Sequence, residues 1–391
     1  MALTTRDLVF GDIRVPYRYG VDCLPEVVDT VAARLADADA VLVVADRQVK
    51  DHAGRLTAPL ARHLRVETFT LDAVEAHKTL FSVQAILEYA TERKLTRRSA
   101  ILAMGGGTVG NVAGLAAALL YRGTRLVHAP TTPVAAFDAV ISLKQGVNLP
   151  AGKNLCGAYF PPSLIVCDLR WLNTVPQGNL HTGLAEMAKN ILVAVPDQGE
   201  RFVRAMADLR HRPMAALRDL LEIGIEAKQP YLTGDPHERG PAVVFEYGHT
   251  VGHAVEFASA GAIGHGEAVA WGMLVAAELG RRLHGLDRDT VQAHHRLTAL
   301  LGLPEAGDRF RRLDRAAVLR ALTADNKRGY ADCAPDEVLM VLLDGPGRPV
   351  RGGDGRPLVP VPVAEVMDAL DTVIRSTEAG AASGQRSGVP R

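Results

Sequence analysis

The stretch from Glu246 to Glu267 gathers residue types that bind metal ions. It holds three histidines and three carboxylates within twenty-two residues. His249 and His253 are four residues apart, so a helix would point both imidazoles to one face, with Glu256 near that face. Neutral imidazoles together with a carboxylate form the ligand set that suits Zn²⁺ or a related divalent ion.

A glycine-containing run, ASAGAIG, interrupts this helix before the third histidine. Gly261 and Gly264 disfavour a continuous helix, and His265 follows at once, before another apolar helical run. A helix, a turn and a second helix start could therefore aim three imidazoles at one point. The alternative is that these histidines are core or capping residues bonded to carbonyls. The motif HExxH is absent, so a zincin protease would lack its general base.

The composition excludes several classes of function. Among 391 residues, 44 basic and 44 acidic side chains cancel, and no basic stripe indicates a nucleic-acid or lipid partner. No apolar run is long enough to cross a bilayer, and the N-terminus lacks the apolar region of a signal peptide. Four scattered cysteines without a CxxC pair are typical of reduced thiols. We therefore expect a cytoplasmic protein that binds neither nucleic acid nor membrane.

Apolar runs predict an α/β architecture in the first part of the chain. Strands buried on both faces of a parallel sheet are typically continuous apolar runs, and helices connect them. Such runs are found at 40–45, 99–104, 125–129 and 164–167. After Pro176 the pattern becomes helical, apart from a short strand expected at 338–343. The predicted parts are an α/β domain over 1–176, an all-helical domain over 177–375 and a disordered tail over 376–391.

A glycine-rich turn follows the 99–104 run. Gly105, Gly107 and Gly110 satisfy GxGxxG between a predicted strand and a predicted helix, where backbone N–H groups can approach a phosphate. The usual acid about twenty residues later is missing. Asp46, at the end of the 40–45 run, is the candidate for a ribose hydroxyl, although it would equally serve as a helix cap. The turn predicts a dinucleotide site, and a tight turn without a ligand is the alternative.

Polar residues after the next strand suit an anionic ligand. Thr131 and Thr132 stand at a strand end, where they could donate hydroxyl protons or cap a helix. Lys144, Lys153 and Asn154 lie in a segment punctuated by glycine and proline. These three residues are suited to a phosphate group, and solvated surface lysines are the alternative.

Taken together, these motifs resemble the dehydroquinate synthase-like sugar phosphate cyclases over roughly residues 5–375. The motifs, in the family's order, are GGGTVGN (105–111), YRG (121–123), PTT (130–132), KN (153–154), GLAEMAK (183–189), GHTVGHAVE (248–256) and HGEA (265–268). The resemblance implies a Rossmann-like NAD-binding domain, a helical metal-binding domain and a homodimer, with the site between the domains. It also implies that NAD and one Zn²⁺ or Co²⁺ serve as cofactors.

Three departures from dehydroquinate synthases indicate the substrate. Glu246 replaces an Asn, Ala242 replaces an Arg that helps hold a substrate carboxylate, and Asn111 replaces an acid. The implied substrate is glucose 6-phosphate, which has no carboxylate, and the implied product is the carbocycle of aminoglycoside antibiotics. The strings SLKQGVNLPAGKNL, FEYGHTVGHA and DNKRGY carry this branch of the resemblance. 3-Dehydroquinate synthase or another cyclase is the alternative, and a polyol dehydrogenase is a more distant one.

The resemblance also assigns roles to single residues. The implied metal ligands are Glu186, His249 and His265, which leaves His253 as an acid, base or orienting residue. The implied catalytic residues are Lys144, Glu246, His253 and Glu238. The implied substrate contacts are Asp138, Lys153, Asn154, Lys189, Lys228, Lys327 and, toward the neighbouring subunit's substrate, Arg122. The implied NAD contacts are Asp46, Glu75, Lys78, Gly105, Gly106, Gly107, Thr131 and Thr132.

Overall fold

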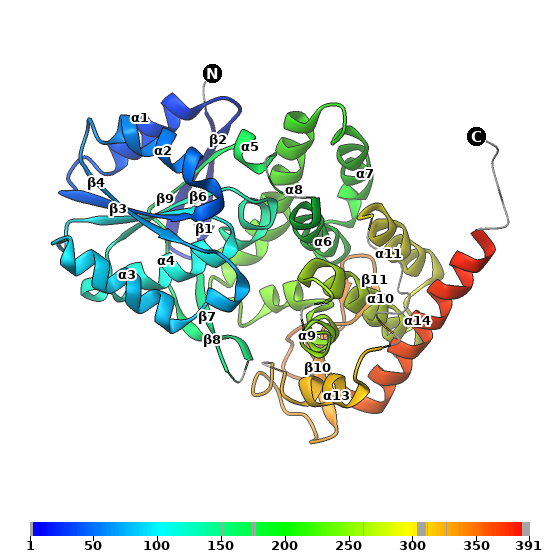
Figure 1. The fold of residues 1–391 in the computed structure, drawn as a ribbon. Coiled ribbons are helices and arrows are strands. Elements are labelled where there is room, and N and C mark those ends of the chain that lie inside the picture. The colour runs from blue at the N-terminus through cyan, green and yellow to red at the C-terminus, as the bar shows by residue number, and fades with distance from the viewer. Residues whose placement is uncertain are drawn as a thin grey trace. The chain divides into compact units, whose positions relative to one another are not determined.

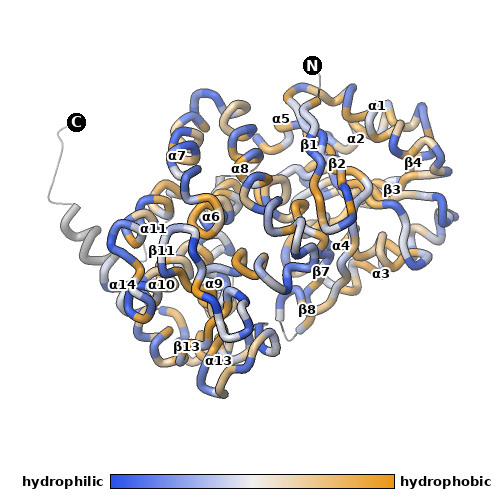
Figure 2. The backbone as a smooth tube through the Cα atoms, turned by 180° about the vertical axis from the view of Figure 1, so that it is seen from behind, coloured by the Kyte–Doolittle hydropathy of each residue, from blue (hydrophilic) through white to orange (hydrophobic). Residues whose placement is uncertain are grey.

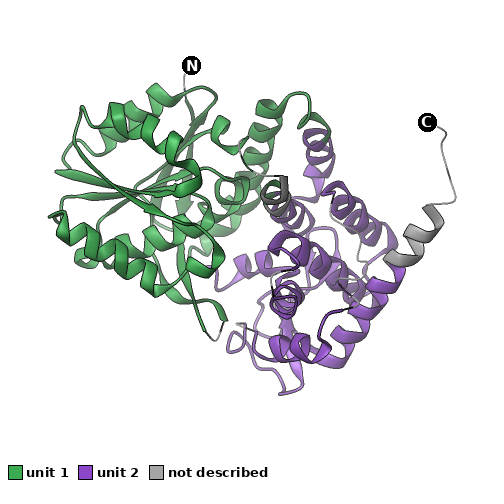
Figure 3. Cartoon of the chain, in the orientation of Figure 1, with its two compact units in different colours: residues 1–183, 207–237 green, residues 184–206, 238–391 purple. Residues whose placement is uncertain are grey.

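The chain forms two compact units in the computed structural model (Figure 3). Unit 1 comprises Met1–Gly183 and Ala207–His237, and unit 2 comprises Leu184–Met206 and Glu238–Arg391. The structure describes residues 3–150, 152–173, 175, 177–260, 262–302, 310, 312–325 and 327–384. None of the helices within these ranges is long and apolar enough to span a membrane.

Unit 1 is built on a seven-stranded sheet with the order β1-β2-β9-β6-β5-β3-β4 (Figure 1). The strands are β1 (Thr4–Phe10), β2 (Ile13–Gly20), β3 (Ala40–Asp46), β4 (Arg65–Leu71), β5 (Ala100–Gly105), β6 (Arg125–Pro130) and β9 (Leu164–Asp168). Among the strand pairs of this sheet that the structure describes, β1–β2 is antiparallel and the others are parallel. The helices are α1 (Leu24–Arg34), α2 (Lys50–Leu60), α3 (Leu80–Glu92), α4 (Gly107–Leu119) and the short α5 (Leu169–Leu172).

Both faces of this sheet are covered by helices, which explains the continuous apolar runs. Val41 and Val43 of β3 pack with buried residues of α1 and α2. Leu42 and Val44, on the opposite face, pack with buried residues of α3 and α4. The central strands are accordingly mostly hydrophobic, whereas the surface helices alternate (Figure 2). The predicted parallel sheet is confirmed, and its carboxyl ends present Asp46, the glycine turn and Thr131 at one edge.

A two-stranded ribbon forms in the segment that is punctuated by glycine and proline, for which no strand was predicted. It consists of β7 (Lys144–Leu149) and β8 (Gly152–Tyr159), which pair antiparallel. A Cβ atom on Gly157 would lie 2.2 Å from the Gln145 carbonyl oxygen, so only glycine allows the two strands to come this close. Lys144 and Lys153 therefore both lie on strands.

Unit 1 also includes a helical segment that the predicted boundary at residue 176 placed elsewhere. Unit 1 continues to Gly183 and takes in α8 (Pro213–Gly234). The reason is a set of contacts between α8 and the sheet side: Glu222 accepts hydrogen bonds from Arg6 (2.9 Å) and from the Tyr19 hydroxyl. Lys228 pairs with Asp138 at 2.9 Å. Pro176 itself lies outside the described residues.

Unit 2 is mainly helical, with short strands. Its helices are α6 (Gln177–Ala194, which begins in unit 1), α7 (Gly199–Asp208), α9 (His249–Ala258), α10 (His265–His284), α11 (Arg288–Leu300), α13 (Arg315–Thr323) and α14 (Val363–Gly384). Two antiparallel pairs, β10 (Glu337–Met340) with β13 (Val359–Pro362) and β11 (Leu343–Gly345) with β12 (Arg348–Pro349), modify the all-helical prediction. Helix α14 continues through residues 376–384, assigned above to a disordered tail, since alanine favours the extension of an existing helix. Residues 385–391 of that predicted tail lie outside the described residues.

Candidate metal centre and cofactor pocket

Three side chains from three helices of unit 2 converge on one point. Glu186 comes from α6, while His249 and His265 are the first residues of α9 and α10. One ligand atom from each lies within 4.8 Å of the others. The Glu186 Oε1 atom is 3.4 Å from His249 Nε2 and 3.1 Å from His265 Nε2. Two imidazoles and a carboxylate in this arrangement are suited to a divalent cation with open positions for a substrate.

Close packing of α9 on α10 fixes the position of His249. Gly248 adopts a left-handed conformation (φ +76°), and a Cβ atom there would lie 2.9 Å from the Met273 backbone nitrogen. A Cβ atom on Gly272 of α10 would lie 1.9 Å from the Gly248 carbonyl oxygen. Any larger residue at either position would push the start of α9 away from α10. The glycines therefore set where the imidazole of His249 can lie.

Hydrogen bonds on the far ring nitrogens orient both imidazoles. His249 Nδ1 lies 3.2 Å from the carbonyl oxygen of Tyr247, which can only accept, so this nitrogen carries the proton. His265 Nδ1 lies 3.1 Å from Glu256 Oε2. With the second ring nitrogen held in this way, each ring would present Nε2 to a cation bound beside Glu186. Partners of this kind hold metal-binding histidines in position and raise their basicity.

The charge balance of the centre favours a cation. Glu186 and Lys189 are each only 3% exposed at the side chain and form a direct ion pair. Burial alone would raise the pKa of Glu186, but Lys189 and His249 hold that pKa well below its usual range. Burial likewise acts to lower the pKa of His265, but hydrogen bonds to Glu186 and Glu256 raise it to about 9. The carboxylates therefore stabilise positive charge where the ring of His265 lies.

His253 lies beside the three converging side chains without joining them. Its ring centroid is 5.2 Å from that of His249 and 5.9 Å from that of His265. Burial, with the nearby His249 and Lys327, holds the pKa of His253 well below its usual value, so the ring is neutral. Its lack of a place among the three ligand atoms fits an acid, base or orienting role.

A buried lysine connects this region with Glu246. Lys327 is 2% exposed, and its ammonium lies 3.0 Å from Asp325 Oδ1 and 3.8 Å from Glu246 Oε2. Glu246 is 28% exposed at the side chain, so it remains accessible to a small molecule. Glu238, another predicted site residue of unit 2, is buried and has a left-handed backbone (φ +51°). Backbone strain in a non-glycine residue is common at functional sites.

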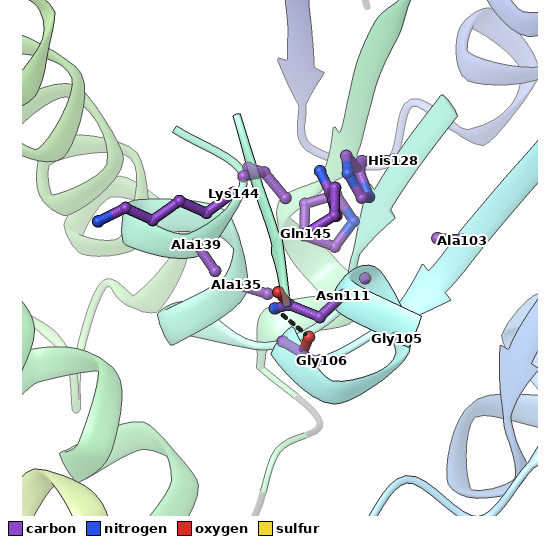
Figure 4. A pocket seen from close by; sticks show the side chains of 13 residues that line it. Ala103, Gly105, Gly106, Asn111, His128, Ala135, Ala139, Lys144 and Gln145 are labelled. Atoms are coloured by element: carbon purple, nitrogen blue, oxygen red, sulfur yellow. Dashed lines mark hydrogen bonds between the residues drawn. The ribbon is translucent and has the colours of Figure 1, made fainter. Parts of the chain in front are cut away.

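The glycine turn of unit 1 borders a pocket (Figure 4). The lining includes Lys144 and Gln145 of β7, Asn111 of α4 and His128 of β6. The remaining lining residues are Ala103, Gly105, Gly106, Gly107, Gly110, Pro130, Ala135, Ala139 and Val140. A pocket at the carboxyl ends of parallel strands, next to a helix N-terminus, is a typical dinucleotide site.

The three glycines of the turn are glycine for different reasons. A Cβ atom on Gly105 would lie 2.7 Å from Val109, and one on Gly106 would lie 3.2 Å from Thr132, so packing explains both. A Cβ atom on Gly107 would approach nothing nearer than Ala139, at 4.0 Å. Packing within the described residues therefore does not require glycine at 107, and a ligand approaching the backbone would.

Asn111, noted above as a departure from dehydroquinate synthases, and His128 line the pocket, although neither was predicted to contact the cofactor. The Asn111 amide donates to the Gly107 carbonyl (2.9 Å) and its oxygen accepts from the Gly146 N–H (2.7 Å). A carboxylate at 111 could not make the first bond, which explains the amide found there. Burial lowers the pKa of His128 to about 4, so its ring is neutral. The only sequence signal for His128 as a pocket residue was its position within an otherwise apolar predicted strand.

The next predicted residues of unit 1 form two groups of paired side chains. Lys78 donates to Asn154 at 2.5 Å, and Glu75 lies 3.6 Å from Lys153, so the ribbon is attached to the segment before α3. Asp138 occupies a π-helical turn, a feature frequent at functional sites. Its ion pair with Lys228 is buried on the lysine side.

Asp46 and Thr132, which the sequence predicted as NAD contacts or as helix caps, both make capping hydrogen bonds. Asp46 accepts a hydrogen bond from the Gln48 N–H at 3.1 Å and so caps a short 3-10 turn. Thr132 accepts from the Ala135 N–H at 3.3 Å, while Thr131 is buried. These capping bonds each occupy one oxygen, and contact with NAD remains a prediction for both. Arg122 is exposed, with a left-handed backbone (φ +68°).

Comparison with known proteins defines the class. Residues 68–182 match the 3-dehydroquinate synthase N-terminal family, and residues 183–328 match the 3-dehydroquinate synthase C-terminal family. The chain is 42% identical to a 2-deoxy-scyllo-inosose synthase from Streptomyces lividus, over 98% of each protein. The chain therefore belongs to the dehydroquinate synthase-like family of sugar phosphate cyclases, and the resemblance seen in the motifs is confirmed.

Two solved structures support the same class. A 2-deoxy-scyllo-inosose synthase complexed with carbaglucose-6-phosphate, NAD⁺ and Co²⁺ is similar at a TM-score of 0.83 and 32% identity, covering 94% of this chain and 99% of that one. A 2-epi-5-epi-valiolone synthase from Streptomyces hygroscopicus subsp. jinggangensis 5008, with NAD⁺ and Zn²⁺ bound, is also similar, with a TM-score of 0.77 and 27% sequence identity. The match covers 95% of this chain and 99% of that one.

Loss of single histidines should separate metal ligands from their neighbour. We expect His249→Ala and His265→Ala to yield protein with little bound metal after loading with Co²⁺ and desalting, because each removes a ligand nitrogen. His253→Ala should retain its metal, as should the control His63→Ala on the surface of unit 1. Elemental analysis of the purified variants measures this. Equal loss in all three centre variants would instead make His253 a ligand.

A methyl group at residue 107 should separate ligand approach from packing. We expect Gly107→Ala to keep the thermal unfolding midpoint but to weaken NAD⁺ binding by about tenfold or more, because the methyl group meets only the ligand. Gly54→Ala in α2, where a Cβ atom meets nothing within 4 Å, is the matched control. Isothermal titration with NAD⁺ measures the affinity. Undiminished affinity would show that NAD⁺ does not approach the protein backbone at this turn.

Proposed function

We propose that this chain converts D-glucose 6-phosphate into 2-deoxy-scyllo-inosose and phosphate, with NAD and one divalent metal ion, in aminoglycoside antibiotic biosynthesis. It acts as a carbon-oxygen lyase on a phosphate. The observation that carries the proposal is the similarity over nearly the full length to 2-deoxy-scyllo-inosose synthases, one of them solved with a glucose 6-phosphate analogue, NAD⁺ and Co²⁺. The Glu186, His249 and His265 cluster supplies a ligand set that fits such an ion.

The substrate assignment is supported by the absence of a positively charged side chain at position 242. In the family, an Arg at the position of Ala242 would help bind a carboxylate, whereas Ala242 is 1% exposed and carries no charge. Four residues later, Glu246 replaces an amide with a carboxylate. A sugar phosphate that offers hydroxyl groups suits this site better than one with a carboxylate, because carboxylates accept hydrogen bonds and repel like charge. This observation disfavours 3-dehydroquinate synthase activity.

The cofactors and the protein have separate tasks in this reaction. When bound, NAD⁺ supplies a reversible oxidation at C4 of the sugar, and the divalent ion supplies Lewis-acid polarisation of that oxygen. Glu186, His249 and His265 would hold the ion, and the glycine turn would hold the dinucleotide. Because the hydride is returned, the overall conversion of the sugar phosphate into a carbocyclic ketone and phosphate is redox-neutral.

The protein residues bind the phosphate and move protons. Lys144, Lys153 and Lys327, with Asn154, are proposed to neutralise the departing phosphate dianion, since ammonium groups stabilise that charge. His253 is neutral and can therefore accept or donate a proton near the metal. Glu246 is proposed to contact a sugar hydroxyl or to accept a proton during elimination. Lys189, Lys228, Asp138 and Glu238 are proposed to complete the pocket.

Two further parts of the proposal concern assembly and location. A homodimer is expected, in which Arg122 reaches the phosphate of the partner's substrate; its exposure leaves it available for this contact. Sedimentation equilibrium would measure the assembly. The cytoplasm is the expected compartment, because NAD and glucose 6-phosphate are both found there.

The reaction itself is tested by its products. With glucose 6-phosphate, NAD⁺ and Co²⁺, we expect the purified chain to release one phosphate for each carbocyclic ketone formed, as measured by NMR. Absorbance at the nicotinamide band should show no accumulation of NADH. Steady NADH accumulation would indicate a polyol dehydrogenase instead. Phosphate release from the heptulosonate phosphate alone would indicate 3-dehydroquinate synthase.

Glu246 offers a separate test of proton transfer. We expect Glu246→Gln to lower turnover by about a hundredfold or more, the usual scale for losing a general acid or base, because the amide keeps the volume but cannot accept the proton. Its metal content should equal that of the unmodified protein. Glu365→Gln, an exposed change in α14, is the control. Unchanged turnover in Glu246→Gln would rule out the assigned role.

A further inference from the structure

A hydrogen bond between two fully buried side chains lies directly behind the predicted ligand His249. The Tyr247 hydroxyl and His294 Nε2 are 2.8 Å apart, and both side chains are 0% exposed. Tyr247 lies two residues before His249, and its carbonyl oxygen is the group that meets His249 Nδ1. The side chain and the backbone of Tyr247 therefore connect α11 with the metal centre.

The proton positions along this connection follow from its ends. His294 Nδ1 lies 2.8 Å from the carbonyl oxygen of Thr290, which can only accept, so Nδ1 carries a hydrogen. Burial lowers the pKa of His294 to about 4, so the ring is neutral and Nε2 has a lone pair. The Tyr247 hydroxyl therefore donates to His294. Each hydrogen bond has a single direction, from His249 to Tyr247 at the backbone and from Tyr247 to His294 at the side chain.

The far end of the connection is firmly held. Asp287 caps α11 through the Thr290 N–H and hydroxyl, each at 2.8 Å. Thr298, one turn beyond His294, donates to the His294 carbonyl at 2.8 Å. At the near end, Tyr247 donates its N–H to the Val244 carbonyl at 3.1 Å, and Gly248 has no space to shift against α10. The Tyr247 carbonyl is thus directed at His249 by supports on both sides.

We propose that His294, acting through Tyr247, is a positioning residue for His249 and so for the divalent metal ion. His294 is forty-five residues from His249 in the chain and touches neither the metal ligands nor a substrate in this role. Metal-binding histidines lose affinity when the partner of their second nitrogen is altered, by about 10–100-fold. The proposal rests on the proposed function only in taking His249 as a metal ligand.

Paired substitutions separate positioning from stability. Tyr247→Phe and His294→Leu each leave one buried polar group without a partner, so both should lower the unfolding midpoint. The double variant removes both polar groups and should recover part of that midpoint. We expect all three to bind Co²⁺ about tenfold more weakly than the unmodified chain, with altered ligand-field bands, because Tyr247 is no longer anchored. His294→Gln, whose amide oxygen can accept from Tyr247, should restore most of the affinity.

Titration of the metal-free full chain with Co²⁺, followed by visible absorption, measures both affinity and ligand geometry. Thr124→Val is the matched control, because it removes a buried hydrogen bond of unit 1, to the Ala117 carbonyl, outside the connection and should leave the Co²⁺ spectrum unchanged. Unmodified affinity and spectrum in the double variant would overturn the proposal. His249→Ala separates the two claims: if it binds Co²⁺ as the unmodified chain does, the metal site itself is wrong and the positioning role falls with it.

Discussion

The carboxylate of Glu186 is the group on which the metal centre depends. A buried carboxylate costs several kcal/mol in lost hydration unless positive charge and hydrogen bonds compensate for it. Lys189 supplies one positive charge, and the Nε2 atoms of His249 and His265 lie within 3.4 Å of a Glu186 oxygen. Hydrophobic residues would fill this space at lower electrostatic cost. Retaining the charge is therefore best explained by a requirement for a cation beside it, which the two imidazoles are oriented to share.

Glycines shape the metal centre of unit 2 and the pocket of unit 1, for different physical reasons. Gly248 and Gly272 let α9 approach α10 more closely than residues with a Cβ atom would, and this close approach sets where α9 begins, at His249. Among the described residues, Ala139 at 4.0 Å is the nearest atom that a Cβ on Gly107 would meet, and Gly107 lines the pocket at the start of α4, where a phosphate could approach. Asn111 joins the glycine turn to β7. The scaffold thus prepares one unit to hold a cation and the other to hold an anion-bearing cofactor, as a redox-neutral cyclisation requires.

Much of the fold and part of the site could be predicted from local patterns. The apolar run 40–45 has the composition of a strand buried on both faces, and β3 is such a strand. Helical spacing put His249 and His253 on one face, but it could not show that only one of them points at Glu186, which lies some sixty residues earlier. The sequence was compatible with Asp46 as a helix cap and as a ribose ligand. The observed capping bond uses one carboxylate oxygen, so ribose binding by Asp46 stays a prediction. The ribbon holding Lys144 and Lys153 was not predicted, because the glycines and the proline in this segment normally argue against strands. Here the missing side chain of Gly157 is what allows the two strands to pair closely. Tyr247 and His294 are joined only by the tertiary fold.

The most direct test of the central claim is the number of imidazoles bound to the metal. X-ray absorption fine structure of the Co²⁺-loaded full chain would count them through the multiple scattering of the imidazole rings. Coordination through Glu186, His249 and His265 predicts two imidazole nitrogens and additional oxygen ligands, at about 2.0–2.2 Å. Three imidazoles would include His253 among the ligands, and a shell without imidazole would place the ion elsewhere; either result would contradict the metal centre described here.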